Sequence, residues 1–381
     1  MEIKQFIKLC LSLIKRPKST FYTLSLTRYS SIYDMRKNIQ DGADWLLESQ
    51  ASAPDGDGYS RQFSLISGWD RCYIETTGYI IPTLFDVSSY LKDERYRESA
   101  IRAGKWLLTV QTGEGAFAEI DDYKPMVFDT GQVMLGLNRL YKELKDKRYL
   151  ESAIKAAEWL VGIQEDDGSW IKFAYNARPH AYYSRVAAAL IETGQLADND
   201  KLIEAGIKQL DWVLAQEQEN GYYKYSEFRP GEDALLHTLV YVMEGFSMAY
   251  DLTGLDRYKE ALIRGTDALR YRLTENGLLY SQYDSQWRAT NTEYCVTGLA
   301  QFAGICYNTF QHTKDPKYSE TAEKVLSNLR RWQVTSGTDL AGALPSSIPV
   351  WGYYGGMSFF NWNTKFFIDA CLKSLYIGVI K

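Results

Sequence analysis

Apolar residues recur along most of this chain at steps of three and four positions, which is the spacing of an amphipathic helix. In residues 94–111 the series includes Tyr96, Ala103 and Leu107, and a glycine-containing turn follows. Residues 128–143 differ, because their apolar side chains surround more of the helix circumference. Such a helix is buried on several sides. The two types alternate, which predicts outer helices of the first kind and inner helices of the second.

The alternation yields twelve predicted helices in six hairpins. The predicted outer helices span residues 36–50, 95–111, 148–164, 200–217, 256–273 and 316–333. The predicted inner helices span residues 74–91, 128–143, 180–193, 233–251, 291–309 and 361–377. Six hairpins closed into a ring bury all their apolar faces, whereas an open solenoid needs polar capping units that this sequence does not clearly contain. We therefore predict an all-α (α/α)6 toroid over residues 31–381, preceded by a basic, amphipathic segment at residues 1–30.

A repeated phrase supports this architecture. The stretch RAGKWLLTVQTGEGAF begins at Arg102, and KAAEWLVGIQEDDGSW begins at Lys155. Their tryptophans, Trp106 and Trp159, are 53 residues apart, and Trp212 follows after another 53. A period of this length indicates one supersecondary unit that is used several times.

The phrase resembles the QW motif of triterpene cyclases and their prenyltransferase-like relatives. Residues 155–170 match it fully, 102–117 match with Phe117 in place of the last tryptophan, 210–223 match loosely, and the sixth unit lacks it. In that family the motif is structural, so the resemblance implies a helical toroid more strongly than cyclase chemistry. Neither the Asp-x-Asp-Asp acid motif of those cyclases nor an Asp-Asp-x-x-Asp diphosphate–metal motif occurs. A terpenoid or prenyl cyclase stays an alternative.

Nearly the whole chain, with its alternating helices and its Tyr- and Trp-rich loops, also resembles toroid enzymes that act on sugars. These are polysaccharide lyases, unsaturated glucuronyl hydrolases and sugar epimerases, so the resemblance implies a carbohydrate-active enzyme. The stretch GW…ETTGYIIPTL, from Gly68 to Leu84, further resembles a group of repeat proteins that points to extracellular-polysaccharide pathways.

In such a toroid all inner helices begin at the same end of the ring. Their free N–H groups and positive dipole ends converge on one mouth, which attracts carboxylates and phosphates. Near the start of each of the first five inner helices, a polar residue recurs at intervals of 54 to 56 positions. The candidate catalytic residues are therefore Glu75, Asp129, Tyr183, His237 and Glu293. The structural alternatives are that Asp129 caps its helix and that His237 is a core histidine.

Polar and aromatic residues flank these positions and are candidates for binding a substrate. They are Trp69, Arg71, Tyr73, Gln132, Arg178, His180, Arg185, Arg288, Asn291, Trp351, Tyr353, Asn361, Asn363 and Lys365. Aromatic faces suit sugar rings, and an arginine grips a carboxylate with two hydrogen bonds. The expected substrate is an acidic, uronate-containing saccharide.

These candidate residues are compatible with several reactions. If an arginine neutralises the uronate carboxylate, the adjacent C–H becomes acidic, and Tyr183 or His237 acts as base and acid in a lyase or an epimerase. A hydrolase instead needs two carboxyl groups from among Glu75, Asp129 and Glu293. A further alternative is a glycan-binding protein without catalysis. The sequence leaves these alternatives open.

The charge and the cysteine and histidine content limit the partners, compartment and cofactors that we expect. The net charge is −5 and no basic stripe follows the N-terminal segment, so nucleic acid is not an expected partner. The five cysteines are scattered without paired spacing, which indicates reduced thiols and a cytoplasmic protein. Three dispersed histidines are too few for a zinc signature, and neither a metal nor another cofactor is expected.

The N-terminal stretch MEIKQFIKLCLSLIKRPK mixes apolar and basic residues. Its apolar run is interrupted by Lys8, is too short to span a bilayer and lacks the small-residue cleavage site of a signal peptide. One interpretation is a basic amphipathic helix on the inner membrane surface, which would suit a lipid-linked saccharide. The other is a helix that docks on the outside of the toroid.

Overall fold

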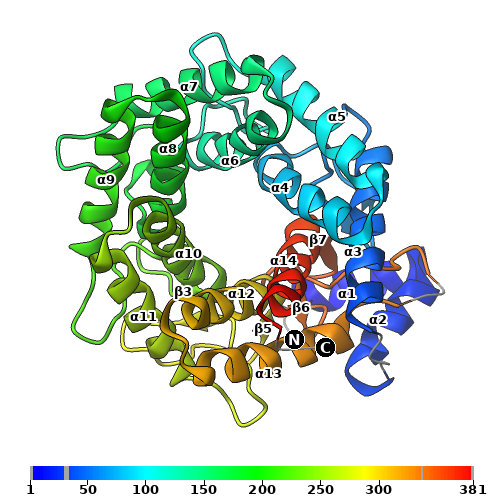
Figure 1. The fold of residues 1–381 in the computed structure, drawn as a ribbon. Coiled ribbons are helices and arrows are strands. Elements are labelled where there is room, and N and C mark those ends of the chain that lie inside the picture. Colours follow the sequence, from blue (N-terminus) through cyan, green and yellow to red (C-terminus); the bar gives the residue numbers. More distant parts are fainter. Residues whose placement is uncertain (1–2, 30–33, 336–337, 379–381) are drawn as a thin grey trace.

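The computed structural model describes residues 3–29, 34–335 and 338–378, and within them twelve helices form two concentric rings (Figure 1). The inner ring consists of α4 (Ile74–Leu91), α6 (Val127–Leu144), α8 (Ser184–Ala197), α10 (Leu236–Thr253), α12 (Val296–Thr313) and α14 (Asn361–Ile377). The outer ring consists of α3 (Met35–Ala51), α5 (Glu94–Val110), α7 (Lys147–Gly162), α9 (Asp200–Leu214), α11 (Asp256–Arg270) and α13 (Pro316–Trp332). The predicted (α/α)6 toroid is confirmed.

The ring is closed rather than open. Each inner helix contacts its two inner neighbours, and α14 contacts both α4 and α3. The apolar positions that predicted the outer helices point inward: Tyr96, Ala103 and Leu107 of α5 are fully buried. The first and last units therefore seal each other's apolar faces, and no capping unit is needed.

Short strands lie near the starts of the inner helices. One sheet has the order β2 (Gly68–Trp69), β1 (Gln62–Ser64), β7 (Ser358–Phe360), and its β1 and β7 strands are antiparallel. Two further pairs join β3 (Ala234–Leu235) to β4 (Gln282–Tyr283) and β5 (Tyr294–Cys295) to β6 (Ser347–Ile348). The sequence pattern missed these strands, so it placed the starts of α10 and α12 several residues too early.

The glutamine of the repeated phrase ties neighbouring hairpins together. The side-chain amide of Gln111 donates to the carbonyl of Gly115 in its own turn, at 2.8 Å, and to that of Ser152 in α7, at 2.9 Å. Gln164 repeats this pattern one unit later. The motif therefore fixes the spacing between successive outer helices, which accounts for its recurrence.

The sixth unit lacks the full phrase but keeps such a glutamine. Gln333 donates to the carbonyls of Asn38 in α3, at 3.0 Å, and of Gly342, at 3.1 Å, and accepts from the Asn38 side chain at 2.7 Å. All three contacts are buried, and together they join the last outer helix to the first.

Replacing Gln333 with alanine is expected to lower the free energy of unfolding by about 2–3 kcal/mol, because it leaves buried amide and carbonyl groups without partners. Urea unfolding measures this change. The matched control is Gln216→Ala, since the Gln216 amide donates to the Trp212 carbonyl of its own helix, and we expect a loss below about 1 kcal/mol. Equal losses in the two variants would contradict the ring-closing role.

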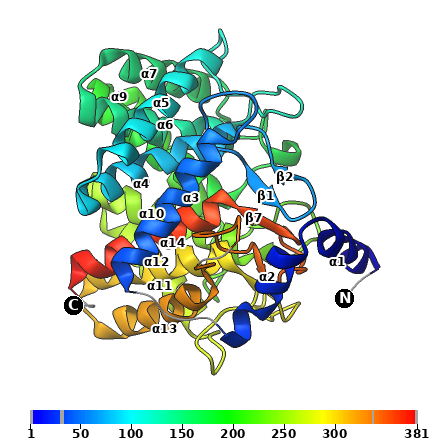
Figure 2. The ribbon, with the colours of Figure 1, turned by 90° about the vertical axis from the view of Figure 1, so that its right-hand side faces the viewer.

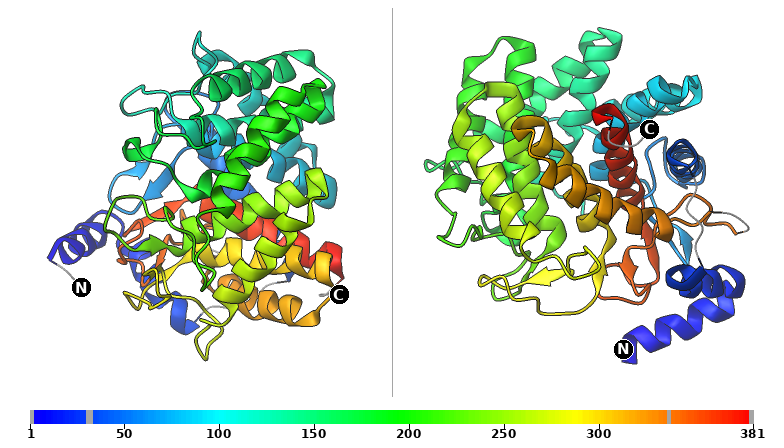
Figure 3. Two further views of the ribbon diagram at one scale, coloured as in Figure 1. Left: turned by 90° about the vertical axis from the view of Figure 1, so that its left-hand side faces the viewer. Right: turned by 60° about the horizontal axis from the view of Figure 1, so that its bottom comes forward.

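Two more helices precede the toroid. The α1 helix (Ile3–Lys15) projects beyond the ring on the side of β1 and β2, and α2 (Pro17–Tyr29) contacts α13 (Figures 2 and 3). The Ser19 hydroxyl donates to Asp339 at 2.5 Å. The predicted boundary between residues 30 and 31 lies outside the described residues. None of the described helices is both long and apolar enough to cross a membrane.

Candidate functional site

A cavity of about 420 Å³ lies beside the starts of α4 and α14, at the end of the ring where the inner helices begin. We call it the mouth cavity; its lining includes Lys8, Arg61, Tyr73, Tyr353, Phe360 and Trp362. It therefore combines two basic side chains from α1 and β1–β2 with aromatic rings from the α4 and α14 ends. Its volume lies in the range of small-ligand sites.

The aromatic rings form a continuous wall. Trp362 stacks on Phe360 with ring centroids 4.2 Å apart, and Tyr73 lies 6.2 Å from Trp362. The guanidinium of Arg61 lies 5.1 Å from the centre of the Tyr73 ring. Flat rings beside a cation suit a saccharide that carries a negative charge.

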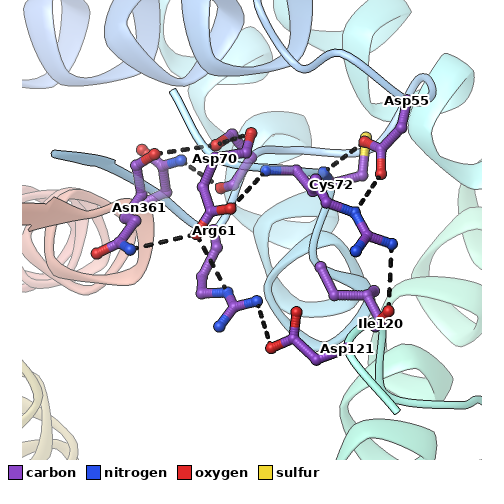
Figure 4. Close-up of polar contacts among 10 residues, drawn as sticks. Asp55, Arg61, Asp70, Cys72, Ile120, Asp121 and Asn361 are labelled. Carbon is purple, nitrogen blue, oxygen red and sulfur yellow. Dashed lines mark hydrogen bonds and ion pairs between the residues drawn. The ribbon is translucent and has the colours of Figure 1, made fainter. Parts of the chain in front are cut away.

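Arg61 is held in place from several directions. Its backbone N–H donates to the Arg71 carbonyl at 3.0 Å, and its carbonyl accepts from Asn361 of α14 at 3.2 Å. Its side chain extends to Asp121, at 2.9 Å (Figure 4). Arg71 instead pairs with Asp55 on the surface, at 3.2 Å. Of these two arginines, Arg61 lines the cavity; sequence analysis chose Arg71, because strand pairing alone decides which one faces inward.

Two carboxyl groups meet at the base of the mouth. Glu75 and Asp129 lie in the first turns of α4 and α6. Burial raises the pKa of Glu75 to about 7, against the opposing effect of hydrogen bonds from Tyr73 and Tyr79. Burial, and then the charge of Glu75, raise the pKa of Asp129 well above its usual value. The loss of a proton from this pair is therefore shifted toward neutral pH.

The Asp129 side chain is only 4% exposed, and its Oδ2 atom has no hydrogen-bond partner among the described residues. The oxygens of a helix-capping side chain would accept hydrogen bonds from backbone N–H groups, but the N-cap position of α6 is occupied by Met126. An unsatisfied carboxyl oxygen beside a second carboxyl is costly to maintain unless a ligand or a proton uses it.

Tyrosines surround the carboxyl pair. Burial, and then the charge of Glu75, raise the pKa of Tyr73, Tyr79 and Tyr241 well above the usual value, so all three lie within electrostatic range of Glu75. Sequence analysis missed Tyr79 and Tyr241. A signal existed, because each lies four residues, or one helical turn, after a candidate residue, Glu75 or His237.

His237 and Arg185 lie deeper between the inner helices. The Nδ1 atom of His237 is 2.7 Å from the Gln301 side-chain oxygen, and its ring centroid is 4.3 Å from that of Tyr241. Burial, with a smaller effect of the Arg185 charge, lowers the pKa of His237 to about 4, so this side chain is neutral at pH 7.

Arg185 is almost fully buried and connects two neighbouring inner helices to its own. It donates to Gln132 of α6 at 2.9 Å and forms an ion pair with Glu244 of α10. Its guanidinium lies 4.8 Å from the Tyr241 ring centre. The charge of Arg185 also opposes the rise in the pKa of Glu75, which places it close to the carboxyl pair.

Tyr183 and Glu293 are held by backbone hydrogen bonds. Burial, and to a smaller extent the charge of Asp129, raise the pKa of Tyr183, so its hydroxyl lies within electrostatic range of Asp129. The buried Tyr183 precedes α8, and its hydroxyl accepts from the backbone N–H of Tyr175 at 2.9 Å. Glu293 precedes β5, and its carboxylate accepts from the backbone N–H of Tyr353 at 2.5 Å. The second position of α12 is Thr297, so the 56-residue spacing that selected Glu293 missed the helix register.

The remaining candidate binding residues fall into two groups. Those held in loops or against the core away from the carboxyl pair are Trp69, Arg178, His180, Arg288, Asn291 and Trp351. Those of α14 support the ring: Asn361 bonds Trp45, Asn363 bonds Ser346, and Lys365 pairs with Asp369. Tyr73 and Tyr353 line the mouth cavity. Arg185, which donates to Gln132, and Lys365 line a second cavity, described next.

A second cavity, of about 450 Å³, opens at the other end of the ring, between the C-terminal halves of the inner helices. Charged side chains in its wall form ion pairs at 2.7 Å, such as Arg139 with Asp86 and Lys142 with Glu192. Burial also raises the pKa of Asp86 in this wall, against the opposing charge of Arg139, so a raised pKa is not confined to the mouth. Among the described residues, the buried carboxyl oxygen without a hydrogen-bond partner is that of Asp129, in the first turn of α6. Within the described residues, no group of three or more acidic, histidine or cysteine side chains is placed to hold a metal ion.

No family model matches the chain. A squalene–hopene cyclase from Zymomonas mobilis is 28% identical over 149 residues, which cover 34% of this chain and 21% of the cyclase. The chain thus spans about a fifth of the length of that curated relative. This similarity carries no information on the rest of the cyclase.

Solved structures resemble nearly the whole toroid. An unsaturated glucuronyl hydrolase specific for heparin has a TM-score of 0.75 at 14% identity, over 91% of this chain and 98% of that chain. An unsaturated glucuronyl hydrolase from Bacillus sp. GL1 has a TM-score of 0.71 at 14% identity, over the same shares. A sugar epimerase from a ruminal bacterium has a TM-score of 0.72 at 13% identity, over 91% and 100%. The chain shares their fold. At these identities the likeness shows the fold alone.

Proposed function

We propose that this protein is a carbohydrate-active enzyme that acts on an acidic, uronate-containing saccharide, with Glu75 and Asp129 as its catalytic carboxyl groups. The observation that carries the proposal is this buried carboxyl pair with raised pKa values, within electrostatic range of Tyr73, which lines the basic, aromatic mouth cavity. Cleavage of a glycosidic bond uses such a pair, one member as an acid and the other as a carboxylate.

Each residue has a defined part in this chemistry. In the reactive state the coupled pair shares one proton: Glu75 carries it and donates it to the glycosidic oxygen, while Asp129 is then the carboxylate that stabilises the positive charge on the sugar or activates a water. The Tyr73 and Tyr79 hydroxyls orient Glu75. After bond cleavage, Glu75 regains a proton from water. If the bound saccharide displaces water from the carboxyl pair, the interactions of Glu75 and Asp129 with the sugar become stronger.

The contacts favour hydrolysis over the lyase and epimerase alternatives. The buried Tyr183 hydroxyl accepts a hydrogen bond from the backbone N–H of Tyr175, and burial raises its pKa, so it does not readily ionise to act as a base. The pKa of His237 is lowered to about 4, and its Nδ1 atom contacts Gln301, so this neutral imidazole is too weak a base for either alternative. The carboxyl pair is the acid–base system that best fits the geometry.

The substrate class follows from Arg61. Its guanidinium and the Lys8 ammonium are the basic groups of the mouth cavity, and the Tyr73 and Trp362 rings offer flat faces between them. A uronate carboxylate would bind Arg61, while the sugar ring stacks on Trp362. The five free cysteines support a reducing, cytoplasmic compartment, and we include a lipid-linked saccharide at the inner membrane face in the proposal.

Replacing Arg61 with glutamine is expected to raise KM for an acidic oligosaccharide by about tenfold or more, because a charge-assisted hydrogen bond is lost. The same oligosaccharide with its carboxyl groups reduced to alcohols should be little affected. Arg71→Gln is the matched control, since the Arg71 side chain pairs with Asp55 on the surface and does not line the cavity. An equal loss on both substrates would contradict uronate recognition by Arg61.

Product analysis in ¹⁸O-labelled water tests the reaction itself. Hydrolysis incorporates one labelled oxygen into a product that mass spectrometry detects. A lyase instead forms an unsaturated sugar without label, and an epimerase leaves the mass unchanged. No change in any uronate-containing saccharide, together with retained binding, would favour the glycan-binding alternative.

A further inference from the structure

The α1 helix exposes the apolar side that a surface helix normally buries. Its outward side chains include Ile3, Phe6 and Ile14, which are 80%, 54% and 75% exposed. Leu9 and Ser12, on the opposite side, face the protein: Leu9 packs on the core and Ser12 is buried. An amphipathic helix on the surface of a globular protein normally turns its apolar side toward the core and its polar side toward the solvent. Docking on the outside of the toroid therefore leaves the apolar stripe uncovered.

Basic residues flank this stripe. At 100° per residue, Lys4, Lys8 and Lys15 form one row beside the apolar positions. Residues 1–29 contain six Lys or Arg and one Glu, whereas the whole chain has a net charge of −5. A narrow apolar face with a lysine row beside it fits the interface of an anionic lipid bilayer, where the apolar side chains enter the headgroup region and the lysines contact phosphates.

The same helix forms part of the mouth. Lys8 lines the mouth cavity together with Arg61 and Trp362. Figures 2 and 3 show α1 beyond the ring on the side of β1, β2 and β7, which is the side where the inner helices begin. A surface that binds the apolar stripe of α1 therefore comes to lie beside the cavity opening.

We propose that α1 docks this protein on an anionic membrane surface and that the mouth cavity then receives a saccharide anchored to a lipid of that surface. The docking step rests on α1 alone. The identity of the substrate rests on the proposed function. Lys8 connects the two, because it lies both in the lysine row and in the cavity wall, where it offsets the repulsion between an acidic glycan and anionic lipids.

Flotation of the protein with vesicles tests the docking step without any assay of activity. Vesicles of phosphatidylcholine with phosphatidylglycerol should carry the wild-type protein upward, and vesicles of phosphatidylcholine alone should carry much less. Phe6→Ser with Ile14→Ser, and separately Lys4→Gln with Lys15→Gln, should each weaken binding by about tenfold or more. The control is Tyr271→Ser, whose side chain is 72% exposed at the end of α11, and it should bind as the wild type does.

Activity on two substrates tests the second step. The Phe6→Ser/Ile14→Ser variant should lose most of its rate on an acidic glycan anchored in vesicles, and should keep its rate on the same glycan free in solution. Binding to vesicles without turnover of any glycan would support docking and overturn the proposed function. Absence of vesicle binding would overturn the inference. So would a wild-type dimer that these substitutions convert to monomers, because the stripe would then be a subunit interface.

Discussion

Replacing Glu75 with glutamine is expected to lower kcat/KM on an acidic oligosaccharide by a factor of about 10² to 10⁴, the usual contribution of a general acid. Glutamine keeps the shape of the side chain but has no proton to give to the leaving oxygen. Because the pKa of Glu75 is raised to about 7, wild-type activity should fall as the pH rises through that value. Initial rates over a pH series measure this fall, and the residual activity of the variant should not show it.

Stability separates this effect from misfolding. A carboxyl group whose pKa is higher in the folded protein than its usual value of 4.5 destabilises the fold as the pH rises from about 4.5 to about 7. Glu75→Gln removes that cost, so its thermal midpoint above pH 7 should equal or exceed that of the wild type. Glu165→Gln, in an exposed turn, is the matched control and should retain full activity. A stable Glu75→Gln variant with full activity would overturn the assignment.

Replacing Arg185 with methionine is expected to lower the free energy of unfolding by about 3–5 kcal/mol, because it leaves the carboxylate of Glu244 buried without its partner. The lost hydrogen bond to Gln132 adds to the cost. Urea unfolding measures the change. Loss of the Arg185 charge should also raise the pKa of Glu75, so the fall in the residual activity should move to a higher pH.

The double variant Arg185→Met/Glu244→Met sharpens this test. Removing both charges removes the unpaired carboxylate, so most of the lost stability should return. Arg95→Met is the control on the surface, where the ion pair with Asp93 is open to solvent and contributes little. If the single variant at Arg185 lost no more stability than Arg95→Met, the buried pair would not be the link between α8 and α10 that its contacts indicate.

The helices and part of the candidate site were predictable because both follow from regular spacings along the sequence, namely the apolar period of a helix and the length of the repeat. The α14 helix begins and ends where the apolar pattern predicted it, since a buried helix shows its period in any window of the sequence. Glu75, Asp129 and His237 were found through the repeat length, because equal units place equal positions at one end of the ring. That argument failed at Glu293, where the strand β5 lies ahead of the helix and shifts the register.

Other parts of the site come from contacts between distant segments. Arg61 lies in the mouth cavity because β1 pairs with β7, which sets Gln62 opposite Phe360. Nothing near Arg61 or Arg71 in the sequence indicates which of them faces inward. The raised pKa of Glu75 likewise depends on burial by tyrosines from several helices, and burial is a property of the assembled ring.

The sequence by itself determined the closed double ring of helices and the gathering of Glu75, Asp129 and His237 at one end, since helical period and repeat length are written along the chain. Only the tertiary structure decided that Arg61 and Trp362 share a cavity, that burial raises the pKa values of Glu75 and Asp129, and that the apolar side of α1 faces outward. The physical reason is that strand pairing, the burial of carboxyl groups and the exposure of a helix side depend on contacts between segments far apart in the chain. The order of residues along the chain does not record these contacts.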